Sequence, residues 1–135
     1  MQIINDVTTL AIEGDIGVLT LNSPPVNALS QPVRAGLLDG MKAANANTAI
    51  KAIVLICDGR TFIAGADITS FGKPPTLPSL SDAQNEIENS SKPVIAAIHG
   101  TSLGGGFEVA LCCHYRVAVP SAKCGLPEGL VGHKA

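Results

Sequence analysis

Two glutamates stand beside glycine-containing segments, where a carboxylate can take part in proton transfer. Glu108 follows the run Gly104-Gly105-Gly106, and Glu128 lies in the turn-rich stretch GLPEG at residues 125–129. The helix dipole stabilises a carboxylate in a first helical turn, so helix capping explains Glu108 equally well. An exposed loop position is the commoner explanation for a glutamate such as Glu128. Spacing alone leaves these alternatives open.

The glycine run itself can bind a negatively charged atom through backbone amides. Without Cβ atoms the chain comes close to a ligand, and a helix N-terminus favours negative charge. The following Phe107-Glu108 differs from the Lys-Ser/Thr of a phosphate-binding P-loop, and a dinucleotide-binding spacing is also missing. Glycines can equally serve a tight turn or close helix packing. The run is therefore either an oxyanion site or a structural feature.

A second glycine motif, at residues 64–67, follows a predicted buried strand. A backbone amide there would face the same crevice at the end of the sheet. Two amides form an oxyanion hole, which stabilises a thioester oxygen as it becomes enolate-like; losing one such donor costs about 3 to 4 kcal/mol. Together with two carboxylates, this set suits the addition of water across an activated double bond. One carboxylate would deprotonate water and the other would deliver the α-proton.

Alternating strands and helices must position these motifs. Segments 7–12 and 17–22 alternate in polarity and predict an antiparallel hairpin. Segments 52–57 and 93–98 are continuously apolar and predict two buried, neighbouring strands. The order of elements predicts an α/β fold.

Helices are predicted between these strands from caps and periodicity. A serine can cap the first, whose early proline is tolerated because first-turn amides lack intrahelical acceptors. A Ser-Asp-Ala-Gln sequence indicates a capping box before the second. The predicted bounds are Ser30 to about Ala46, Ser81-Asp82-Ala83-Gln84 to about Ser90, and 107–114, followed by a short strand at 117–119.

Composition indicates a globular chain without a strongly charged partner. Of the 135 residues, 46% are hydrophobic and 15% charged, and the formal net charge is -2. We therefore expect one compact domain that binds neither nucleic acid nor a membrane. No apolar run approaches the roughly 20 residues that cross a bilayer. No targeting segment is evident, so a cytoplasmic location is expected.

Four cysteines lie at positions 57, 112, 113 and 124, without C-x-x-C spacing. Neighbouring helical side chains point about 100° apart, so Cys112, Cys113 and the following His114 are poor joint ligands for one ion. We predict no metal site, and we predict that all four cysteines are buried apolar residues.

Three segments resemble the crotonase family in order and spacing: TFIAGADI, then KPVIAAIHGTSLGGGFEVALCCHYRVA, then KCGLPE. The resemblance covers Val7 to about Gly129. The segments PPVNALS and CHYR are most similar to the hydratase part of bifunctional enoyl-CoA hydratase/3-hydroxyacyl-CoA dehydrogenases of fatty-acid β-oxidation. The family fold is a spiral of strand-strand-helix units, which the resemblance implies here.

The resemblance also assigns roles to individual residues. It implies that the amides of Ala66 and Gly105 form the oxyanion hole and that Glu108 and Glu128 do the acid/base work. It requires no metal or redox cofactor, because coenzyme A is part of the substrate. The residues expected to line the CoA moiety are Ala64, Gly65, Asp67, Ile68 and Gly104.

Because both glutamates are present, the resemblance implies an enoyl-CoA hydratase acting on trans-2-enoyl-CoA. The alternatives are an enoyl-CoA delta isomerase, other crotonase-type enolate chemistry, or a catalytically silent fragment that binds acyl-CoA. The family continues beyond Leu130 into a glycine-rich helix start, so residues 1–135 are expected to be the N-terminal part of one crotonase-like domain, incomplete at the C-terminus. Expected partners are an acyl-CoA and either further copies of the chain, a trimer in much of the family, or a dehydrogenase domain.

Overall fold

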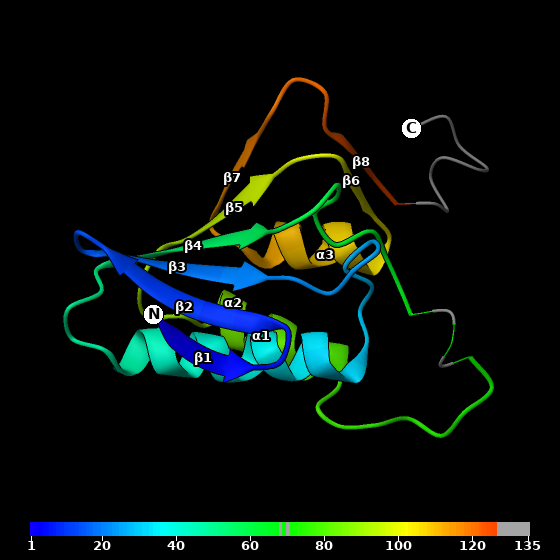
Figure 1. Cartoon of the computed structure of the whole chain (residues 1–135), viewed down its shortest axis with the longest axis horizontal. Coiled ribbons are helices and arrows are strands. Elements are labelled where there is room, and N and C mark those ends of the chain that lie inside the picture. The colour runs from blue at the N-terminus through cyan, green and yellow to red at the C-terminus, as the bar shows by residue number, and fades with distance from the viewer. Residues whose placement is uncertain (68, 70, 127–135) are drawn as a thin grey trace.

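The computed structural model describes residues 1–67, 69 and 71–126. In this part of the chain a six-stranded sheet has the order β1-β2-β3-β4-β5-β7 (Figure 1). The first three strands pair antiparallel, and the pairs from β3 to β7 are parallel. The α/β class and the opening hairpin are therefore confirmed. The strands are β1 (Gln2–Asn5), β2 (Thr8–Glu13), β3 (Ile16–Leu21), β4 (Ala52–Cys57), β5 (Val94–Ile98) and β7 (Tyr115–Ala118).

Short extended segments outside the main sheet give the fold its repeating unit. β6 (Thr101–Leu103) follows β5 and pairs in parallel with β8 (Lys123–Gly125) in a second sheet. Earlier in the chain, Leu29 and Ala66 form an isolated parallel bridge. A strand of the main sheet is thus followed by an outer extended segment and then a helix. This is the strand-strand-helix order that the resemblance implied.

The described residues contain three α-helices: α1 (Gln31–Ala46), α2 (Leu80–Glu88) and α3 (Gly105–Cys112). For α1 the prediction is confirmed, because Ser30 is its N-cap and accepts a hydrogen bond from the Val33 amide at 3.4 Å. The α1 and α2 helices lie side by side below the sheet in Figure 1.

The predicted capping box of α2 is wrong. The reciprocal pair is Ser79 with Asp82: the Asp82 amide donates to Ser79 Oγ at 3.0 Å, and the Ser79 amide donates to Asp82 Oδ2 at 2.9 Å. The helix begins at Leu80, whose side chain packs against the core, so Ser81 already lies inside it. It also ends at Glu88, before the predicted Ser90.

Two further boundaries differ from prediction. The α3 helix begins at Gly105 rather than at 107, and β7 begins at Tyr115 rather than at 117. The glycine run therefore supplies the first helical turn itself. Strands β1, β6 and β8 were not predicted, because three or four residues carry too little periodicity to indicate a strand.

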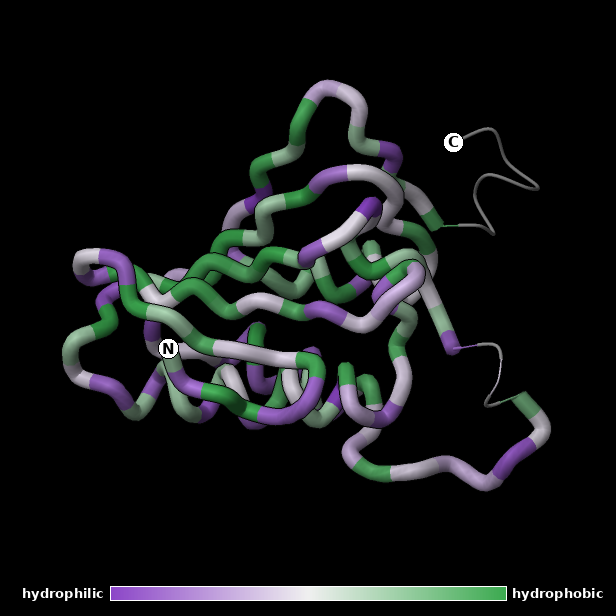
Figure 2. The backbone as a smooth tube through the Cα atoms, in the orientation of Figure 1, coloured by the Kyte–Doolittle hydropathy of each residue, from purple (hydrophilic) through white to green (hydrophobic). Residues whose placement is uncertain are grey.

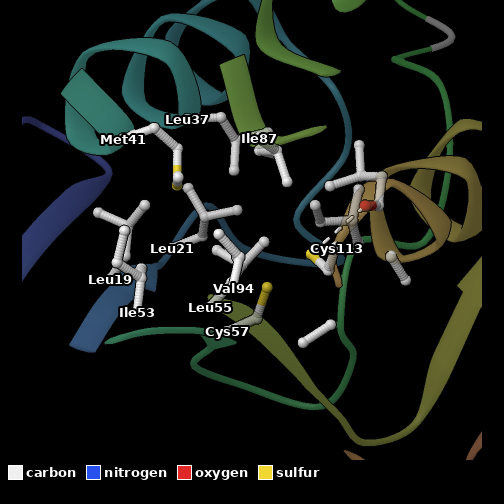
Figure 3. Close-up of a cluster of buried hydrophobic side chains, with 14 of the residues drawn as sticks. Leu19, Leu21, Leu37, Met41, Ile53, Leu55, Cys57, Ile87, Val94 and Cys113 are labelled. Carbon is white, nitrogen blue, oxygen red and sulfur yellow. Dashed lines mark hydrogen bonds between the residues drawn. The ribbon is translucent and has the colours of Figure 1, made fainter. Parts of the chain in front are cut away.

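The core lies between the helices and the central strands. In Figure 3, Leu37 and Met41 of α1 and Ile87 of α2 point toward Leu19 and Leu21 of β3 and toward β4 and β5. All of these side chains are fully buried. The central strands are accordingly hydrophobic along most of their length (Figure 2). Burying each such side chain contributes about 1.5 to 3 kcal/mol, so the core holds the sheet that carries the site.

The cysteine prediction is confirmed for Cys57 and Cys113, which are buried, and is wrong for Cys124, which is exposed. Cys124 lies on the three-residue strand β8, which pairs only with β6 and is not covered by the core. Cys112 is half-buried. Among the described helices, none combines the length and hydropathy needed to cross a membrane.

Candidate active site

Two adjoining cavities lie where the glycine motifs meet. The first, which we call the Glu108 cavity, has a volume of about 510 Å³. The second, the Gly65 cavity, has a volume of about 600 Å³. Both are lined by Ala66, Asp67 and Gly105. The two backbone positions predicted to form an oxyanion hole are therefore shared by both cavities, at their common boundary.

The other predicted site residues divide between the two cavities. Glu108 lines only the first, and Ala64, Gly65 and Gly104 line only the second. Ile68 and Glu128 lie outside the described residues. Three residues that the sequence did not predict, Arg34, Lys73 and Leu80, also line the Glu108 cavity. None of these three belongs to a glycine motif or carries an obvious chemical role, so no local signal marked them.

The segment that carries Ala66 is held by a short ladder of backbone hydrogen bonds. The Ala64 amide donates to the carbonyl of Val26 at 3.1 Å, and the Leu29 amide donates to the carbonyl of Gly65 at 2.9 Å. Neither bond uses the amide of Ala66, which has no acceptor within the described residues. The two bonds hold the backbone immediately before Ala66.

Asn27 fixes the turn that leads into this ladder. It is buried and has a positive φ of 52°, a conformation that asparagine adopts more easily than most residues. Its Nδ2 donates to the carbonyls of Asp58 at 3.0 Å and Thr61 at 2.9 Å, while its Oδ1 accepts from the Ser23 amide at 2.7 Å. Sequence reasoning missed Asn27. The only available signal was an asparagine in a proline-containing turn.

Gly105 and Gly106 have different reasons to be glycine. Gly105 occupies the first position of α3, and the first bond of that helix runs from the Glu108 amide to the Gly104 carbonyl at 2.9 Å. The Gly105 amide therefore has no intrahelical acceptor. A Cβ on Gly106 would collide with the carbonyl oxygen of Ile63. Close packing therefore explains Gly106, while the oxyanion role predicted for Gly105 stays a prediction.

Glu108 is in the first turn of α3, so the helix dipole favours its charge. Glu108 lines the same cavity as Ala66 and Gly105. A Cβ on Gly105 would stand 3.9 Å from Glu108 Oε1. Proton transfer next to a polarised carbonyl would use a carboxylate close to two such backbone positions.

Asp67 carries the remaining carboxylate at the shared boundary. The Thr69 hydroxyl donates to Asp67 Oδ1 at 2.6 Å and lowers the pKa of Asp67 below its usual value. The Thr69 amide, 3.1 Å from the same oxygen, and the charges of Lys73 and Arg34 act in the same direction. Asp67 is therefore an anion at neutral pH and is unsuited to donate a proton.

The described residues contain no group of three His, Cys, Asp or Glu side chains placed to hold a metal ion. The His114 ring, next to the two adjacent cysteines, makes a structural contact instead. Its Nδ1 accepts a hydrogen bond from the Val94 amide at 3.0 Å.

Sequence comparison relates residues 11–135 to the family described as enoyl-CoA hydratase/isomerase. A peroxisomal bifunctional enzyme of Danio rerio is 43% identical over 121 residues, which are 90% of this chain and 17% of that protein. A Bacillus subtilis protein named probable enoyl-CoA hydratase is 39% identical over 127 residues, 89% of this chain and 49% of the other. The matched part of this chain thus spans about half the length of the Bacillus subtilis protein and under a fifth of the Danio rerio protein.

Solved structures show the same likeness. An enoyl-CoA hydratase/carnithine racemase from Magnetospirillum magneticum superposes with a TM-score of 0.83 at 34% sequence identity. The match covers 95% of this chain and 52% of that one. The chain therefore corresponds to about half of that solved structure.

Proposed function

Because this chain belongs to the enoyl-CoA hydratase/isomerase family, we propose that it carries the oxyanion hole and an acid/base glutamate of an enoyl-CoA hydratase in fatty-acid β-oxidation. The observation that supports this most directly is the position of the Ala66 and Gly105 amides at the boundary of two cavities, one of which contains Glu108. The reaction adds water to trans-2-enoyl-CoA.

The two cavities fit the two ends of a thioester. With the thioester carbonyl at their boundary, the acyl group extends into the Glu108 cavity and the pantetheine arm of CoA into the Gly65 cavity. Backbone lining by Ala64, Gly65 and Gly104 suits an extended, flexible arm, since amides and carbonyls can bind it without a matching side chain. An acyl group can contact the apolar residues Leu29, Pro74 and Leu80.

In the proposed reaction, water adds its oxygen to C3 of the enoyl group while C2 gains a proton. The C2=C3 π bond is broken, and negative charge develops on the thioester oxygen, where the two amides stabilise it. Glu108 and Glu128 share the two proton movements, one taking a proton from water and one delivering a proton to C2. Hydration transfers no electrons overall, so the proposal needs no redox cofactor; coenzyme A enters as part of the substrate.

The test follows the hydration of crotonyl-CoA by absorbance. The absorbance of the conjugated enoyl thioester falls as the protein consumes this substrate. The test is run on this chain and on a chimera that continues with the C-terminal half of the Bacillus subtilis relative. In whichever form is active, Glu108→Gln should lower kcat by about 10²- to 10⁴-fold. The matched control is Glu86→Gln on α2, a glutamate that lines neither cavity and whose variant should hydrate normally. Normal hydration by Glu108→Gln would refute the proposed chemistry.

A catalytically silent acyl-CoA-binding fragment remains the second candidate, because the chain spans about half of the Bacillus subtilis relative. Calorimetric titration with butyryl-CoA, which cannot be hydrated, distinguishes the two. Binding by this chain with turnover only in the chimera supports the fragment, whereas turnover by the chain itself excludes it. Assembly with further copies or with a dehydrogenase domain, like the cytoplasmic location, stays a prediction.

A further inference from the structure

Arg34 makes an unusual set of contacts on the wall of the Glu108 cavity. All four hydrogen bonds from its guanidinium reach backbone or hydroxyl oxygens. Nε donates to the carbonyl of Pro78 at 2.9 Å, and Nη1 donates to the carbonyl of Leu29 at 2.7 Å. Nη2 donates to the carbonyl of Thr76 at 3.0 Å and to its Oγ1 at 2.8 Å. The side chain therefore joins three separate points of the chain.

Those points belong to the segments that enclose the cavity. Thr76 and Pro78 lie in the connector 73–79, which leads into α2 and extends away from the body of the fold in Figure 1. Within this connector Lys73, Pro74, Pro75, Thr76 and Ser79 line the Glu108 cavity. Leu29 also lines this cavity, and its amide belongs to the ladder that holds the Ala66 segment. Arg34 consequently links the connector to the segment that pairs with the Ala66 segment.

Apart from the capping bonds between Ser79 and Asp82 at its end, the connector has little else in the described residues to hold it. Gln31 of α1 adds one bond, from Nε2 to the carbonyl of Leu77 at 2.9 Å, and Leu77 itself is 78% exposed. Prolines at 74, 75 and 78 supply no amide donors. A planar guanidinium with five donors can bind several carbonyls at once, whereas an ammonium cannot reproduce that fork.

We propose that Arg34 is a positioning residue that fixes connector 73–79 as a wall of the Glu108 cavity and thereby determines which acyl groups the cavity accepts. This inference rests on the proposed function, because it assumes that the acyl group occupies that cavity. Arg34 does not act on the reacting atoms. It acts through the position of Pro74, Pro75 and Thr76.

The test compares wild type, Arg34→Met, Arg34→Lys and Lys42→Met in the full chain. Lys42 is exposed on α1 and contacts neither the connector nor the Glu108 cavity, so its variant controls for the loss of one positive charge from the helix. Hydrogen exchange measures how fast the connector amides of Thr76, Leu77 and Ser79 exchange with solvent. Calorimetry gives the Kd values of butyryl-CoA and octanoyl-CoA.

Arg34→Met should speed exchange in the connector and change the ratio of the two Kd values by about tenfold, which corresponds to about 1.4 kcal/mol in the relative binding free energy of the two acyl groups. Arg34→Lys should give a smaller shift in the same direction, and Lys42→Met should match wild type. A folded Arg34→Met with the wild-type ratio overturns the inference. If Arg34→Met does not fold, an unchanged ratio in Arg34→Lys overturns it. If wild type binds neither ligand and the chimera does not hydrate crotonyl-CoA, the proposed function itself is refuted, which separates the two failures.

Discussion

The amide of Leu29 donates to the carbonyl of Gly65 at 2.9 Å, and this bond joins the segment before α1 to the segment that carries Ala66. The two residues are far apart in sequence, yet the bond sets where the Ala66 amide lies relative to Gly105. The geometry of the candidate oxyanion hole therefore depends on contacts made outside both glycine motifs.

Asn27 is the residue on which that alignment depends most. Asn27→Ala removes three hydrogen bonds, leaves the carbonyls of Asp58 and Thr61 without that donor, and places alanine at a positive φ. We expect a loss of about 2 to 4 kcal/mol in the free energy of unfolding, measured by urea denaturation. Asn27→Gly removes the same side-chain hydrogen bonds, but glycine adopts a positive φ without strain. This variant should therefore lose less free energy of unfolding than Asn27→Ala. Equal stability of Asn27→Ala and wild type would contradict this account.

Gly105→Ala should mainly weaken ligand binding, whereas Gly106→Ala should mainly lower the stability of the fold. A methyl group on Gly105 would stand 2.7 Å from Leu29 Cδ1, at the edge of the Glu108 cavity, where a flexible side chain can yield. We expect near-wild-type thermal stability but at least about tenfold weaker binding of butyryl-CoA, because the methyl group narrows the boundary of the cavities.

Gly106→Ala meets the backbone carbonyl of Ile63, which cannot move without the Ala66 segment. We expect destabilisation by about 1 to 3 kcal/mol, measured in the same thermal and urea unfolding experiments. If instead Gly105→Ala unfolded first while Gly106→Ala remained as stable as wild type, the roles assigned to the two glycines would have to be exchanged.

Thr69→Val should raise the pKa of Asp67 toward its usual value, because the hydroxyl that donates to the carboxylate is the largest cause of its lowering. The Asp67 pKa is depressed in the folded state. Its contribution to stability is therefore present above the unfolded value of about 3.9 and is lost as pH falls through the folded value. The stability difference between wild type and Thr69→Val should accordingly shrink below about pH 4. NMR titration of the Asp67 carboxyl carbon measures the shift, and an unchanged pKa would show that Thr69 is not its cause.

The cysteines should react with a thiol reagent in the order of their burial. Burial raises the pKa of the Cys113 thiol to about 12 and also raises the pKa of Cys57, so few thiolates exist at pH 8 and access is blocked. Exposed Cys124 should be labelled first, and half-buried Cys112, whose pKa burial also raises, more slowly. Mass spectrometry of timed samples gives the order. Labelling in denaturant provides the reference for full access, and rapid labelling of Cys57 in the folded chain would contradict the described core.

Features with a local physical cause were predicted well. Ser30 and Pro32 mark the start of α1 because capping and proline tolerance depend on neighbouring residues only. Central strands were evident from apolar runs. The start of α2 was misplaced because two serines near Asp82 satisfy the same pattern, and only the packing of Leu80 decides between them.

By itself, the sequence determined the α/β class, the core strands and the presence of an ionisable glutamate next to glycines, since these follow from residue type, periodicity and short spacing. Only the tertiary structure decided that Gly105 faces the cavities while Gly106 meets the Ile63 carbonyl, and that Asn27 and Arg34 hold the walls. These assignments depend on contacts between segments that are distant along the chain. Such contacts come from the packing of the whole fold, so no local pattern records them.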